Sequence, residues 1–221
     1  MTYNLPPKLV LFDCDGVLVD SERVAIQVLV QDFRDFGLEM DVDEAVDLFT
    51  GGTFRSAGEE ARRRGAAIPD NWAEGFYPRM YAALADGVPL VDGVVELIDR
   101  IEAQGVQTGI VSNGAMEKMA VTLTPHGLMD RFEGQIFSAY TYGVSKPNPE
   151  LVWIATRHFG VDPADAAFVD DSRSGCQAGQ AAGVFTVGYA ADAPAAKLAP
   201  HANCVVTSMT EIAELLALDA N

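Results

Sequence analysis

An unbroken apolar run near the N-terminus ends in two aspartates that stand two residues apart. The run is KLVLFDC, from Lys8 to Cys14, and it leads into Asp15 and Gly16. A continuous run of this length is typical of a parallel β-strand that is buried on both faces. Because parallel strands are joined by crossovers that are usually helical, the rest of the chain is expected to supply helices between strands.

The remainder of the chain falls into two patterns. Residues 18–88 show four helical stretches and no strand, which predicts an inserted all-helical domain. From residue 89 onward, helices alternate with four further apolar strands, which predicts right-handed crossovers and a doubly wound parallel sheet. The expected fold is therefore an α/β core of residues 1–17 and 89–221 with five strands, and residues 190–200 are expected to form a loop.

Composition excludes several classes of function. The 221 residues include 15 Lys and Arg against 32 Asp and Glu, a formal net charge of −17 that repels nucleic acid and anionic lipid and favours solubility. No apolar run reaches the ~18 residues of a membrane span, and no signal peptide is evident, so a cytoplasmic location is expected. The three cysteines are scattered without CxxC spacing, which argues against a disulfide framework or a zinc site.

Polar side chains follow each of the first four predicted strands. They are Asp13 and Asp15, then Ser112 and Asn113, which the backbone of Gly114 follows, then Lys146, then Asp170 and Asp171. Ligands of open α/β sheets bind at the carboxyl ends of the strands, so these groups are expected to converge. Four crowded carboxylates repel one another unless a cation lies among them, and oxygen ligands select a hard ion such as Mg²⁺. A hydroxyl, backbone N–H groups and an ammonium suit a transferring phosphoryl group.

Four segments, FDCDGVLVDSE, VSNG, SKPNPE and FVDDS, resemble in order and spacing the signature motifs of the haloacid dehalogenase superfamily of phosphatases. The resemblance covers essentially the whole chain, and the helical insert is similar to the helical cap of that superfamily. Within it the chain looks most like sugar-phosphate phosphatases, phosphoglycolate phosphatases and β-phosphoglucomutase. The resemblance implies Mg²⁺-dependent hydrolysis of a small phosphorylated molecule through an aspartyl-phosphate. The acidic charge and the lack of a membrane span predict no nucleic-acid or membrane partner, and a monomer or weak homodimer is expected.

The resemblance also implies a role for each matching residue. Asp13 would be the nucleophile, and Asp15 would be the general acid and then the general base. Lys146 would offset charge between Asp13 and the phosphoryl group. Ser112, Asn113 and Gly114 would hold phosphate oxygens. The implied metal ligands are Asp13, Asp15 through its backbone carbonyl, Asp170 and Asp171; which of the last two contacts the ion directly is open.

The choice of reaction and substrate leaves alternatives. True dehalogenases differ from this chain at Asp15, which therefore favours phosphoryl transfer. β-Phosphoglucomutases carry a cap histidine where this chain has Ala25. They also carry a cap arginine, to which Arg55 corresponds only with a shift of one position. Both differences favour a phosphatase over a mutase, which is kept as the alternative; a non-enzymatic binding protein is a further one. Gly51, Thr53 and Arg55 of the GGTFRS segment are the candidate substrate contacts, unless the segment is an ordinary turn.

Overall fold

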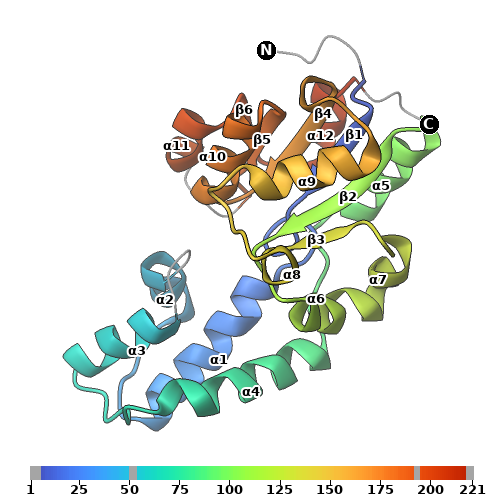
Figure 1. The fold of residues 1–221 in the computed structure, drawn as a ribbon. Coiled ribbons are helices and arrows are strands. Elements are labelled where there is room, and N and C mark those ends of the chain that lie inside the picture. The colour runs from blue at the N-terminus through green and yellow to red at the C-terminus, as the bar shows by residue number, and fades with distance from the viewer. Residues whose placement is uncertain (1–5, 50–53, 192–194, 218–221) are drawn as a thin grey trace. The chain divides into compact units, whose positions relative to one another are not determined.

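The computed structural model describes residues 6–49, 54–191 and 195–217. The chain divides into two compact units, one made of Met1–Val19 with Leu90–Asn221 and the other of Asp20–Pro89. The first unit contains a β-sheet flanked by helices, whereas the described residues of the second are helical or in connecting turns (Figure 1).

The sheet of the first unit has six strands, and every neighbouring pair is parallel. Their order across the sheet is β3-β2-β1-β4-β5-β6, so the chain moves outward from β1 to one edge and then returns to the other side of β1. The carboxyl ends of β1 and β4 flank this switch point, where ligands of open α/β sheets bind. The strands are β1 (Leu9–Phe12), β2 (Gln107–Ser112), β3 (Ile136–Ser138), β4 (Ala166–Asp170), β5 (Phe185–Tyr189) and β6 (Cys204–Val206).

The predicted doubly wound parallel sheet is confirmed, but the predicted count of five strands is wrong. The sixth strand, Cys204–Val206, has three residues at the edge of the sheet, and two of them are only partly buried. Such a short edge strand lacks the long apolar run that marks β1. The predicted loop at 190–200 is also partly wrong, because Ala195–Leu198 form a helix and Ala199–His201 a 3-10 turn.

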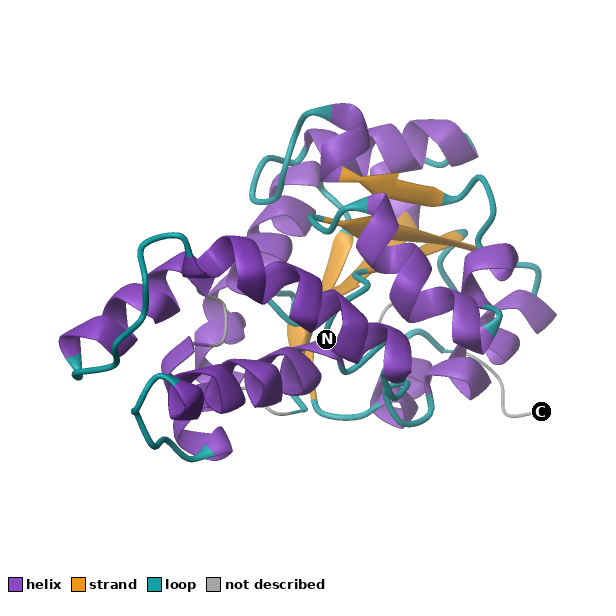
Figure 2. Ribbon diagram, turned by 90° about the horizontal axis from the view of Figure 1, so that it is seen from below, coloured by secondary structure: helices purple, strands orange, loops and turns teal. Residues whose placement is uncertain are grey.

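Helices cover both faces of the sheet (Figure 2). On one face α9 and α10 pack against each other and against the strands, over an apolar cluster that includes Leu11, Phe137 and Phe168. Helices α5 and α12 form another packed pair, and α5 contacts β2. The helices of this unit are α5 (Val94–Ala103), α6 (Met116–Leu123), α7 (Leu128–Arg131), α8 (Ala139–Tyr142), α9 (Glu150–Phe159), α10 (Arg173–Ala182), α11 (Ala195–Leu198) and α12 (Met209–Leu215), with 3-10 turns at Thr124–His126, Pro163–Asp165 and Ala199–His201.

The second unit has an aromatic core of its own. The ring centroids of Trp72 and Phe76, which lie on one helix, are 4.8 Å apart in a tilted arrangement, and the ring centroid of Phe33 lies 6.0 Å from that of Trp72. The buried carboxylate of Asp32 accepts a 2.8 Å hydrogen bond from Trp72 Nε1 and pairs with Arg79. The helices are α1 (Ser21–Asp35), α2 (Val42–Phe49), α3 (Phe54–Arg63) and α4 (Trp72–Asp86).

Among the described residues, no helix is both long and apolar enough to cross a membrane.

Candidate active site at the carboxyl edge of the sheet

Asp13 stands directly after β1, where the chain leaves the sheet. Its N–H donates to the Val169 carbonyl of β4, which extends the pairing of the two central strands by one residue. Its carboxylate is almost wholly buried, and Oδ1 accepts a 2.7 Å hydrogen bond from the Cys14 N–H. The chain then turns at Gly16, which has a φ of +76° that favours glycine. The turn holds the carboxylate of Asp13 at the sheet edge.

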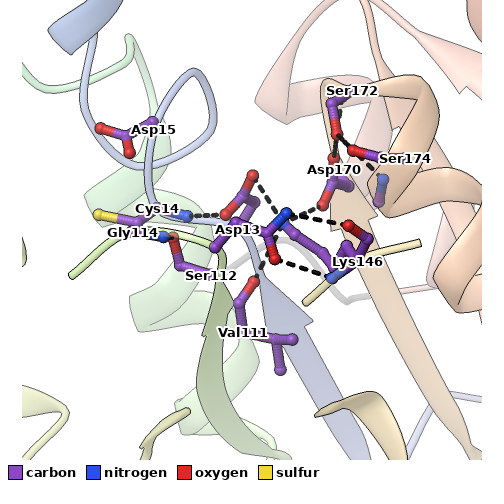
Figure 3. A network of polar contacts seen from close by, with 12 residues as sticks. Asp13, Cys14, Asp15, Val111, Ser112, Gly114, Lys146, Asp170, Ser172 and Ser174 are labelled. Carbon is purple, nitrogen blue, oxygen red and sulfur yellow. Dashed lines mark hydrogen bonds and ion pairs between the residues drawn. The ribbon is translucent and has the colours of Figure 1, made fainter. Parts of the chain in front are cut away.

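The ammonium of Lys146 lies at the centre of a buried polar cluster (Figure 3). Its Nζ is 2.9 Å from Asp13 Oδ2 and 2.7 Å from Asp170 Oδ2, and it donates to the Val111 carbonyl at 3.3 Å. Only 2% of the Lys146 side chain is exposed. One cation therefore joins the carboxylates at the carboxyl ends of β1 and β4, as convergence at the strand ends predicts.

Burial and charge act on these groups in opposite directions. Burial raises the pKa of Asp13 to about 7; Lys146 opposes this increase and the Asp170 charge adds to it. Burial also disfavours the ammonium of Lys146, but Asp13 and Asp170 outweigh that effect and raise the pKa of Lys146. Lys146 therefore stays protonated, and its single positive charge is shared by two carboxylates.

Asp170 and Asp171 differ in how their carboxylates are held. Asp170 is fully buried: Oδ2 faces Lys146, while Oδ1 accepts hydrogen bonds from the N–H and hydroxyl of Ser172 at 2.8 and 2.6 Å. Ser172 is also the N-cap of α10, where its hydroxyl accepts a hydrogen bond from the Gly175 N–H. The carboxylate of Asp171 packs against Gly16, since a Cβ built at Gly16 would lie 2.0 Å from Asp171 Oδ2.

One carboxylate oxygen from each of Asp13, Asp170 and Asp171 lies within 4.8 Å of the other two. The donors are all oxygen atoms, which fits a hard cation such as Mg²⁺ and fits zinc or copper poorly. The residues present therefore suit the cation that the sequence implies.

The segment after β2 contributes polar groups to the same edge. The hydroxyl of Ser112 is buried and accepts a 3.0 Å hydrogen bond from the Gly114 N–H. The side-chain amide of Asn113 donates to the Lys146 carbonyl at 3.1 Å and accepts from the Lys146 N–H at 2.8 Å. The Asn113 side chain therefore holds the segment that carries Lys146, a structural role that the sequence did not indicate.

Asp15 and Lys118 form an ion pair that the sequence did not predict. The Asp15 carboxylate points away from the cluster around Lys146 (Figure 3), and its Oδ1 lies 2.7 Å from Lys118 Nζ. Burial lowers the pKa of Lys118, but the charge of Asp15 and the hydrogen bond to it outweigh burial and raise it. A signal for Lys118 was present in the sequence, because a lysine in the first turn of a helix opposes the helix dipole and needs an anion nearby.

The candidate substrate contacts in GGTFRS are not brought into the site by these observations. Gly51 and Thr53 lie outside the described residues. Arg55 is an exposed residue of α3 in the helical unit. Contact of these three residues with substrate stays a prediction.

Comparison with known families matches residues 10–189 to the haloacid dehalogenase-like hydrolases. The chain belongs to this family. The match spans β1 to β5 and so includes every core site residue described above. The resemblance inferred from the four motifs is confirmed.

Relatives within the haloacid dehalogenase-like hydrolases cover nearly the full chain. It is 31% identical to 6-phosphogluconate phosphatase of Escherichia coli (strain K12), over 93% of this chain and 91% of that protein. It is 30% identical to validoxylamine A 7'-phosphate phosphatase of Streptomyces hygroscopicus subsp. limoneus, over 93% and 95%. A crystal structure of a family hydrolase from Deinococcus radiodurans R1, with bound phosphate and sodium, superposes with a TM-score of 0.87 at 30% identity and covers 99% of this chain and 100% of that one.

Proposed function

We propose that the protein is a Mg²⁺-dependent phosphatase that hydrolyses a small phosphomonoester through an aspartyl-phosphate on Asp13. The observation that carries this proposal is the buried ammonium of Lys146 placed between the carboxylates of Asp13 and Asp170. The names of two relatives, both phosphatases, support the reaction class. The phosphate bound by the Deinococcus structure supports an oxyanion ligand.

The first chemical step is transfer of the phosphoryl group to Asp13. A carboxylate oxygen of Asp13 forms a bond to phosphorus while the ester P–O bond breaks. Asp15 gives its proton to the departing alcohol oxygen. Lys146 stays protonated and offsets the negative charge that gathers between Asp13 and the phosphoryl oxygens.

The second step is hydrolysis of the aspartyl-phosphate. Asp15, now a carboxylate, takes a proton from water while the water oxygen forms a bond to phosphorus. The bond between phosphorus and Asp13 breaks, so inorganic phosphate leaves and both aspartates return to their starting states. Ser112, the Asn113 backbone N–H and Gly114 are proposed to hold the phosphate oxygens in both steps.

Asp13, the Asp15 backbone carbonyl and Asp171 are proposed to hold Mg²⁺. Both Asp170 oxygens already accept hydrogen bonds, so Asp171 is assigned as the direct ligand and Asp170 as a residue that acts through water. Bound there, Mg²⁺ would supply positive charge that offsets the charge of the phosphoryl oxygens.

The substrate is proposed to be a sugar phosphate, a phosphorylated sugar acid or phosphoglycolate. A relative that carries the name 6-phosphogluconate phosphatase supports a phosphorylated sugar acid. Gly51, Thr53 and Arg55 remain the proposed contacts for the non-phosphate part of the substrate. A panel of phosphorylated metabolites, with released phosphate as the readout, would rank these classes.

The test of the reaction is turnover of p-nitrophenyl phosphate with Mg²⁺. We expect hydrolysis by the native protein and none by Asp13→Asn, which keeps the size of the side chain but removes its charge. Hydrolysis by Asp13→Asn at the native rate would overturn the proposal. Formation of glucose 6-phosphate from β-glucose 1-phosphate would favour the mutase alternative instead.

A further inference from the structure

Lys118 and Asp15 form an ion pair that is largely withdrawn from water. Lys118 Nζ lies 2.7 Å from Asp15 Oδ1, and only 23% and 25% of the two side chains are exposed. Lys8 and Asp165 make a pair with the same 2.7 Å separation, but their side chains are 70% and 44% exposed. Exposed pairs fix geometry weakly, whereas a pair with less access to water attracts more strongly. The Lys118 contact is therefore able to hold a side chain in place.

Both partners are attached to backbone that is held by hydrogen bonds. Asp15 lies in the turn after β1, which is closed by hydrogen bonds from the Gly16 N–H to the Val19 carbonyl and from the Leu18 N–H to the Cys14 carbonyl, each 2.9 Å. Lys118 lies in the first turn of α6, which follows the Ser112–Gly114 segment. The first turn disfavours a cation, so helix stability does not explain a lysine at this position.

The ion pair separates Asp15 from the neighbouring carboxylates. Asp13 and Asp170 share Lys146, while Asp15 points away from that cluster (Figure 3). Asp15 Oδ2 lies only 3.6 Å from where a Cβ at Gly114 would stand, so Asp15 borders the segment proposed to hold phosphate. Lys146 thus pairs with the proposed nucleophile Asp13 and with Asp170, whereas Lys118 pairs with Asp15, the proposed proton donor.

We propose that Lys118 is a positioning residue that holds the Asp15 carboxyl group for proton transfer to the leaving oxygen, an inference that rests on the proposed phosphatase function. Proton transfer requires the acid to lie within hydrogen-bond reach of the ester oxygen, and misplacement of a reacting group by about 1 Å lowers rates steeply. The effect of losing Lys118 therefore depends on how much the leaving group needs a proton.

The experiment measures kcat/KM for three aryl phosphates of similar shape: phenyl, 4-nitrophenyl and 2,4-dinitrophenyl phosphate. Phenolate leaves poorly without a proton, whereas dinitrophenolate leaves readily. For Lys118→Met we expect kcat/KM to fall about tenfold or more with phenyl phosphate, since general acid catalysis contributes about 10²–10⁴-fold in total. With 2,4-dinitrophenyl phosphate we expect kcat/KM to fall by less than about twofold, because dinitrophenolate leaves without needing a proton. kcat/KM is chosen because it reports the step in which the leaving group departs.

Two further variants complete the design. Lys118→Arg keeps the positive charge, so we expect a smaller loss that is again largest for phenyl phosphate; this variant decides the question if Lys118→Met does not fold. Lys8→Met removes the exposed pair of equal length and is expected to leave all three values unchanged. An equal fall for all three substrates in the Lys118 variants, or no fall, would overturn the positioning role alone. Absence of turnover by the native protein would overturn the phosphatase function together with it.

Discussion

At the scale of single residues, Gly16 is the position where a small change is expected to disturb the metal site most directly. A Cβ there would lie 2.0 Å from Asp171 Oδ2, a distance that forces the carboxylate to move. We therefore expect Gly16→Ala to raise the Mg²⁺ concentration needed for half-maximal activity by about 10–100-fold, the range seen when supports of metal ligands are changed. Activity measured against Mg²⁺ concentration, after removal of metal with a chelator, checks this.

The matched control for Gly16→Ala is Gly105→Ala. Gly105 has a φ of +73°, close to the +76° of Gly16, but nothing lies within 4 Å of a Cβ built there. Both variants should lose about 1–3 kcal/mol from backbone strain. Only Gly16→Ala should change the Mg²⁺ requirement, and the same shift in Gly105→Ala would show that strain, and not the Asp171 contact, is responsible.

A second prediction for a single residue concerns Lys146 and stability. Replacement by Met leaves the buried carboxylates of Asp13 and Asp170 side by side without their shared cation. Removing one partner of a buried ion pair typically costs about 3–5 kcal/mol, so we expect Lys146→Met to lower the free energy of unfolding by about that amount. Urea denaturation in the absence of Mg²⁺ measures it. A loss no greater than that of Lys8→Met, expected below about 1 kcal/mol, would contradict the prediction.

At the scale of elements, α10 depends on its small residues to approach the sheet. A Cβ at Gly179 would lie 2.5 Å from Thr186 Oγ1 of β5 and 3.1 Å from Phe168 Cδ1 of β4. We expect Gly179→Ala to destabilise the protein by about 1–3 kcal/mol, because the helix must move away from the strands. Thermal unfolding checks this. Ala181→Leu is the control, because it adds volume on the exposed face of α10, where no strand is in the way. A gain in stability for Gly179→Ala would rule out close packing as its role.

Elements with a continuous apolar pattern could be predicted from the sequence, whereas features set by contacts between distant segments could not. The apolar run before Asp13 indicated a buried strand, and the structure has that strand. The strand Cys204–Val206 was missed because three residues at an edge carry too little pattern. The Asn113 contact with Lys146 joins residues 33 positions apart, and the Lys118 contact with Asp15 depends on how α6 follows β2, so spacing alone revealed neither.

At the scale of the whole molecule, a site for an anion has to exist in a chain with a net charge of −17. Lys146 lies among buried carboxylates and Lys118 beside Asp15, so two lysines face the four aspartates of the site and do not outweigh their charge. Ligand binding at this site is therefore expected to need Mg²⁺ as well as the lysines. Stability of the entire protein reports such binding, because a ligand that binds only the folded state raises its free energy of unfolding.

The analogue that tests this is beryllium fluoride, which mimics a phosphoryl group on a carboxylate. At a concentration about 100 times its Kd it should add about 2.7 kcal/mol, or about 5–10 °C in Tm for a chain of this size, because each kcal/mol shifts Tm by about 2–4 °C. The increase should require Mg²⁺ and beryllium fluoride together, since the complex on Asp13 needs both. Asp13→Asn should show no increase, because its amide is a poor ligand for beryllium. An equal increase in Asp13→Asn would show that the anion binds elsewhere and that Asp13 is not the residue that accepts the phosphoryl group.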